Sequence, residues 1–77
     1  MNTQKLKGLR VERGLTQKEA SDMIEKSTDS YAKKERSEVE FTLDEALLLT
    51  LGFGMDFDQF NAIFFNGSLP FGKNEAT

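Results

Sequence analysis

Two stretches decide the fold: Leu15-Thr16-Gln17-Lys18-Glu19 and Ser27-Thr28-Asp29-Ser30-Tyr31-Ala32-Lys33-Lys34-Glu35. In the first, Thr16 and Glu19 have the spacing of a capping box, in which each side chain binds the backbone N–H of the other residue. In the second, Ser27 is a residue type that caps a helix start well. The pattern predicts one helix from Thr16 to about Ile24 and another over residues 28–36.

These two helices, joined by a tight turn, form a helix-turn-helix arrangement, which fits its second helix into the major groove of DNA. On the outward side of that helix, Thr28 can contact a thymine methyl group, Asp29 can accept a hydrogen bond from cytosine, and Lys33 can donate to guanine. Gln17 begins the preceding helix, where its amide can reach a phosphate. The predicted contacts to double-stranded operator DNA are Gln17, Ser27, Thr28, Asp29, Ser30, Lys33 and Lys34.

Three further helices are predicted around this unit, and no strand. Gly14 ends a helix over residues 3–13. Thr42 and Glu45 form a second capping box, which opens a helix that Gly52 ends. Asp56 opens a last helix that ends at residues 66–67. The prediction is therefore an all-α, five-helix domain over residues 1–66, followed by an irregular tail over residues 67–77.

Apolar residues indicate how these helices pack. The helix that Thr42 opens is apolar almost all round, through Ala46, Leu47, Leu48 and Leu51, and we expect it to be the buried centre. In the last helix, one arc of side chains is expected to face the core, whereas Phe65 points away from it. The residues of that arc are Phe57, Phe60, Ile63 and Phe64.

The composition excludes several classes of function. The 77-residue chain has no cysteine and no histidine, which removes disulfides, thiolate metal sites and the commonest general base. A domain of this size also has little room for a walled catalytic cleft. We therefore expect no enzymatic activity, no cofactor, no metal and no small-molecule substrate. No segment approaches the ~18 apolar residues of a membrane span, so a cytoplasmic protein is expected.

The net charge of −3 is unevenly divided along the chain. Residues 1–36 hold nine Lys and Arg against six Asp and Glu, whereas residues 37–77 hold one Lys against seven Asp and Glu. Salt screens exposed charges over about 8 Å, so the two parts present separate potentials. The positive first part can attract DNA although the chain as a whole is acidic.

The sequence resembles the Cro/Xre family of helix-turn-helix regulators, over roughly residues 3–65. The likeness rests on Leu15-Thr16-Gln17 at the start of the first motif helix, on Glu35 at the end of the second, and on Leu6, Leu9 and Arg10 before them. It implies a five-helix, lambda-repressor-like fold in which Arg10 and Glu35 form a structural ion pair. Glu25 and Ser37 stand where the family usually has glycine.

The run over residues 30–36 and the ending Ile63-Phe64-Phe65 look most like small regulators of temperate phages. The resemblance implies a transcriptional regulator that binds operator DNA in a lysis/lysogeny-type switch.

Several acidic and aromatic residues indicate an alternative function. Asp29, Glu38 and Glu40 repel phosphates, and a candidate partner interface consists of Phe65, Leu69 and Phe71, which have no evident place in the core. These features favour a protein-binding antirepressor, which engages a partner repressor and binds DNA weakly or only in the complex. A weak homodimer and an antitoxin-like regulator are also compatible with the sequence.

Overall fold

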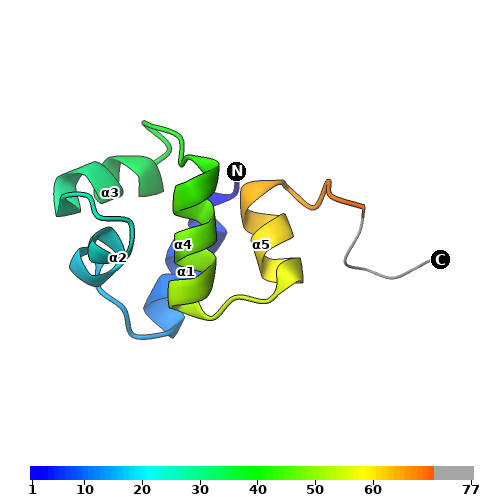
Figure 1. The fold of residues 1–77 in the computed structure, drawn as a ribbon, viewed down its shortest axis with the longest axis horizontal. Coiled ribbons are helices and arrows are strands. Elements are labelled where there is room, and N and C mark those ends of the chain that lie inside the picture. The colour runs from blue at the N-terminus through cyan, green and yellow to red at the C-terminus, as the bar shows by residue number, and fades with distance from the viewer. Residues whose placement is uncertain (71–77) are drawn as a thin grey trace.

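The computed structural model describes residues 1–70, which form five α-helices and no strand (Figure 1). In Figure 1, α2 and α3 lie at one end of the molecule and α5 at the other, with α4 between them and α1 behind it. The predicted all-α, five-helix architecture is confirmed. The helices are α1 (Thr3–Glu12), α2 (Gln17–Met23), α3 (Thr28–Glu35), α4 (Leu43–Phe53) and α5 (Phe57–Phe64).

Every helix starts at a side-chain cap, as a chain with this many short helices requires. The Oγ1 atom of Thr16 accepts the Glu19 N–H at 3.0 Å, while the Glu19 carboxylate accepts the Thr16 N–H at 2.8 Å. The other caps are Asn2, Ser27, Thr42 and Asp56, of which the last two also form capping boxes. The predicted starts of α2 to α5 are therefore confirmed.

The predicted end of α4 at Gly52 is wrong. The helix continues to Phe53, and Gly54, with a φ angle of 69°, caps it in the left-handed conformation that glycine adopts without strain. Gly52 serves packing instead, because a Cβ at this position would overlap Sδ of Met23 on α2. The missing side chain lets α2 lie close against α4.

The core lies where the helices converge, and its most buried large side chains are Leu6, Tyr31, Leu49 and Ile63. Phe64 links two parts of this core, with its ring centroid 5.9 Å from that of Phe41. The predicted inward arc of α5 is confirmed: Phe60, Ile63 and Phe64 are buried, and Phe57 is half-buried against them.

The expectation that α4 is buried all round is wrong. Ala46, Leu49 and Phe53 face the core, but Leu47 and Leu48 are exposed. Leu51 is the most exposed large hydrophobic residue of the described chain, at 80%. A small domain has too few helices to cover every face of a central one. One face of α4 therefore stays open to solvent.

Two turns require backbone conformations that usually call for glycine. Glu25, between α2 and α3, has a φ angle of 58°, and Ser37, just after α3, has one of 66°. The turn between α2 and α3 keeps its hydrogen bonds, with the Lys26 N–H donating to the Ser21 carbonyl at 3.0 Å. The chain thus accepts local strain at both turns.

Replacing either residue by glycine should raise the free energy of unfolding by up to ~1 kcal/mol. The left-handed conformation costs a residue with a side chain ~1–2 kcal/mol, and the greater entropy of unfolded glycine offsets about 0.4–1 kcal/mol of the gain. Urea unfolding of Glu25→Gly and Ser37→Gly measures the change. Lys26→Gly is the control and should lower stability, since φ of Lys26 is not positive. Destabilisation by all three glycines would contradict the strain assigned to these turns.

Candidate nucleic-acid interface

The carboxylate of Glu35, at the end of α3, joins three helices. It accepts hydrogen bonds from Nε and Nη2 of Arg10 on α1, at 2.9 and 3.2 Å. It also accepts from the Tyr31 hydroxyl, at 2.8 Å, and from Nε2 of Gln17 at the start of α2, at 3.0 Å. Arg10 further donates to the Leu15 carbonyl at 2.7 Å. The expected ion pair is present, and it is the centre of a larger network.

This network is buried, and its protonation states are fixed accordingly. Burial alone would raise the pKa of Glu35, but hydrogen bonds from Arg10, Gln17 and Tyr31 outweigh it and hold the pKa below its usual value. The hydrogen bond to Glu35 also raises the pKa of Arg10. Burial and the same carboxylate raise the pKa of Tyr31, whose hydroxyl stays protonated as a donor. The result is a charged pair with a neutral tyrosine, which fixes α3 against α1 and α2.

The outer face of α3 carries two of the residues predicted to contact bases. Thr28, Asp29 and Lys33 are all exposed, and the i, i+4 spacing brings the Lys33 ammonium within 3.4 Å of the Asp29 carboxylate. Ser27 is exposed as well, but its hydroxyl accepts the N–H of Ser30 as the helix cap. Asp29 and Lys33 thus share one solvent-facing surface. Thr28 is exposed at the start of α3, but it lies on the side of Glu35, with its hydroxyl 3.5 Å from that of Ser21 on α2. Ser27 and Ser30 shape the same end of the helix.

Gln17 lies beside a polar depression of about 520 Å³ next to that surface. Lys7 and Arg36, which the sequence reasoning did not assign to the site, line the same depression. One signal for Lys7 was available: it precedes Arg10 by one helical turn and so shares its side of α1. The Arg36 guanidinium pairs with Glu38 at 2.7 Å, and both side chains are about half exposed. Two cations therefore flank the predicted phosphate contact.

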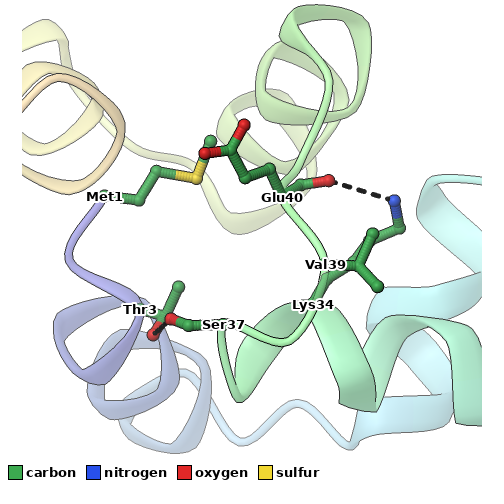
Figure 2. A pocket seen from close by; sticks show the side chains of 6 residues that line it. All are labelled: Met1, Thr3, Lys34, Ser37, Val39 and Glu40. Atoms are coloured by element: carbon green, nitrogen blue, oxygen red, sulfur yellow. Dashed lines mark hydrogen bonds between the residues drawn. The ribbon is translucent and has the colours of Figure 1, made fainter.

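The structure contradicts the predicted DNA contact of Lys34. Its ammonium lies 3.1 Å from the carboxylate of Glu45, with both side chains buried, and it donates to the Glu40 carbonyl at 3.3 Å. Figure 2 shows this second bond at the edge of a cavity of about 240 Å³. Because Lys34 lies on the inner side of α3, three residues from the core residue Tyr31, it anchors α4 and the loop between α3 and α4.

The aromatic end of the chain differs from the expectation as well. Phe65 does not point away from the core: it is half-buried, with its ring centroid 5.4 Å from that of Phe60. Leu69 packs against the same cluster and exchanges two hydrogen bonds with the Asn61 side chain. Phe71 lies outside the described residues. The partner interface assigned to these three residues stays a prediction.

A family model described as helix-turn-helix matches residues 6–60, which is more than half of the chain. The protein therefore belongs to the Cro/Xre-like helix-turn-helix family, and the resemblance seen in the sequence is confirmed. It is a DNA-binding transcriptional regulator with the all-α, lambda-repressor-like fold. Searches of curated proteins and of solved structures each gave no match.

Two further properties concern residues 1–70 only. No helix in this range is long and apolar enough to cross a membrane. No group of three or more acidic residues in the same range is arranged to hold a metal ion.

Removing the Glu35 charge should destabilise the fold by ~3–5 kcal/mol, because it leaves the buried Arg10 unpaired. Urea unfolding of Glu35→Gln measures the effect. Tyr31→Phe, which removes a single hydrogen bond to the carboxylate, should cost a smaller ~1.5–3 kcal/mol. Glu12→Gln, on the exposed side of α1, is the control and should change stability by less than about 0.5 kcal/mol.

The same network predicts a dependence of stability on pH. The folded pKa of Glu35 is lowered, so its contribution is complete above about pH 4.3, the ordinary value for Glu, and is lost as pH falls through the lower folded value. Wild-type stability should decline in that acidic range, and the decline should be shallower in Glu35→Gln. Equal pH profiles for the two proteins would count against the assignment.

Proposed function

We propose that the protein controls transcription by placing α3 in the major groove of operator DNA. The observation that carries this proposal is the division of α3 into two sides. Tyr31 and Glu35 hold one side against α1 and α2. Asp29 and Lys33 stand on the other side, and Thr28 is exposed at the N-terminal end of the helix. A rigidly held helix with short polar and basic side chains on its free side suits base recognition.

The ion pair between Lys33 and Asp29 does not prevent base contact. Both side chains are about half or more exposed, and such i, i+4 pairs contribute only ~0.3–0.5 kcal/mol. Lys33 can therefore exchange this carboxylate for the O6 and N7 atoms of guanine. Asp29 is then released to accept a hydrogen bond from a cytosine amino group.

Phosphate contacts are assigned to the depression at the start of α2. Lys7, Gln17 and Arg36 line it, and the partial positive charge of the α2 N-terminus adds to theirs. Such contacts carry no sequence information but set the register of α3 on the duplex. Lys7 and Arg36 attract the phosphates. The outer face of α3 attracts them little, because the charge of Lys33 is balanced by that of Asp29.

The lysis/lysogeny setting is part of this proposal. It is supported by the likeness of residues 30–36, and of the α5 ending, to small regulators of temperate phages.

Lys33→Ala should change base preference at one operator position by ~1–3 kcal/mol. Double-stranded DNA selected from a random pool by the wild-type protein supplies the operator, and binding to single-base variants measures the preference. Lys5→Ala is the matched control, because Lys5 is exposed on α1 beside the groove between α1 and α5. A uniform loss across all variants would make Lys33 a phosphate contact, and no loss would remove it from the interface.

Glu38→Gln should strengthen DNA binding, by roughly two- to fivefold. Glu38 forms an ion pair with Arg36 and adds a negative charge next to the surface that meets phosphates. Without this carboxylate, Arg36 is free to pair with a phosphate, and no negative charge repels the DNA there. Fluorescence anisotropy against the selected operator measures the change at fixed salt. Asp58→Asn on α5 makes the same change in net charge and should leave affinity nearly unaltered. Equal gains from both variants would point to overall charge instead of this position.

A second candidate function is the protein-binding antirepressor. It is supported by Glu38 and Glu40, which place negative charge in the loop after α3, where a DNA-binding surface is disfavoured by phosphate repulsion. A basic DNA-binding domain is a partner of complementary charge. Titration calorimetry with a basic helix-turn-helix repressor distinguishes the two functions. Tight binding to that repressor with weak operator binding favours the antirepressor, and the reverse result excludes it.

A further inference from the structure

Among residues 1–70, one face of α4 presents leucine side chains to solvent with no helix over them. Leu43, Leu47 and Leu51 follow one another at intervals of four residues and are 59%, 46% and 80% exposed, and Leu48 beside them is 42% exposed. Residues four apart in a helix lie on the same side, one turn above another. These residues therefore form one continuous apolar stripe, here called the leucine face. A soluble monomer rarely exposes so much adjacent apolar surface without a use for it.

An apolar hollow adjoins the leucine face at the start of α4. Its volume is about 220 Å³, large enough to receive an aliphatic side chain. Leu43 forms part of its wall, so the hollow is continuous with the stripe. The other lining residues are Met1, Phe41, Thr42, Ala46, Phe64 and Phe65. The face thus combines a protruding end, at Leu51, with a receiving end, at Leu43.

We propose that the leucine face binds the same face of a second copy of this chain, with the two α4 helices antiparallel. A two-fold contact requires a surface that is complementary to itself. The stripe meets this condition because Leu43 and Leu51 lie at equal distances on either side of Leu47. A two-fold axis at Leu47 places Leu51 against Leu43 of the partner subunit. The most exposed side chain of each copy then meets the apolar hollow of the other.

The charges on α4 permit a second copy as the occupant, and the small area of the face limits how tightly it binds. Asp44 is the only charged residue on this side of α4, and the two-fold axis keeps the two Asp44 carboxylates on opposite sides of Leu47, so no like charges meet. A stable interface buries about 800 Å² on each partner. Such an interface takes about 20–30 residues a side, whereas α4 has eleven residues, of which only some face outward. The dimer is therefore weak and forms as concentration rises.

The arrangement has a consequence for α3. In Figure 1, α3 lies to one side of α4, along the long axis of the molecule. A two-fold axis that crosses α4 in this direction leaves both copies of α3 at the same end of the dimer. Two such helices at one end can meet successive major grooves, as dimeric helix-turn-helix proteins do. This consequence rests on the proposed DNA-binding function, whereas the dimer itself does not.

Sedimentation equilibrium over a wide concentration range tests the dimer in the absence of DNA. We expect the wild-type mass to rise from 8.7 kDa towards twice that value as concentration increases. Leu47→Lys and Leu51→Lys should each raise the dimer dissociation constant at least tenfold, with helical circular dichroism unchanged. Val11→Lys is the matched control, since Val11 is an exposed apolar residue on α1. A wild-type protein that stays monomeric at every concentration overturns the proposal, as does dimerisation that survives both α4 substitutions.

Single cysteines test the position of the axis, because the chain contains no cysteine of its own. Residue 47 lies on the proposed two-fold axis, so the Leu47→Cys protein should form a disulfide-linked dimer on mild oxidation. Leu51→Cys should not, since the two copies of this residue are ~12 Å apart along the helix direction, beyond the ~7 Å limit for a disulfide. A mixture of Leu43→Cys and Leu51→Cys should give the cross-linked heterodimer. Efficient linkage through Leu51→Cys alone contradicts the antiparallel register. These readouts need no DNA, so the dimer can fail while operator binding stands, and the converse also holds.

Discussion

The carboxylate of Glu35 is the constraint on which the rest of the structure depends. It is buried and charged, and a buried carboxylate is tolerated only when donors surround it. Here the donors come from α1, α2 and α3, so the hydrogen bonds that satisfy Glu35 also fix the positions of the three helices. The arrangement of the helix-turn-helix is therefore the same arrangement that supplies Glu35 with its hydrogen-bond donors.

A second buried pair, between Lys34 and Glu45, extends the same logic to α4. Burial alone would raise the pKa of Glu45, but the hydrogen bond from the Thr42 N–H and the Lys34 ammonium outweigh burial, hold the pKa below its usual value and keep the group charged. Glu45 thus has two functions, as the closing residue of a capping box and as the counter-charge of α3. The two ion pairs involve neighbouring residues of α3, Lys34 and Glu35. Together they hold the inner side of α3 against α4 and α1.

Much of the fold could be predicted from the sequence because its signals are local. Capping pairs such as Thr16 with Glu19 act over three residues, and they place helix starts correctly. Burial depends on neighbours that are distant in the sequence, and there the prediction for α5 held while others failed. Leu51 looks like a core residue on its own helix, but no other element of the described chain covers it. Lys34 looks like a DNA contact, but its partner Glu45 is eleven residues away, on another helix. Gly52 looks like a helix stop until Met23 is seen to pack against it.

The division of α3 into an anchored and an outward side also bears on how the DNA specificity of such a protein can evolve. The side chains of Asp29 and Lys33 pair with each other and make no hydrogen bond to the Glu35 network. Substitution at these positions leaves the supports of the helix in place, so a lineage can acquire a new target sequence without first acquiring a new scaffold. The same separation makes the outward positions suitable for a combinatorial library. The inner edge of α3 offers no such freedom, because a change there must be matched on another helix at the same time.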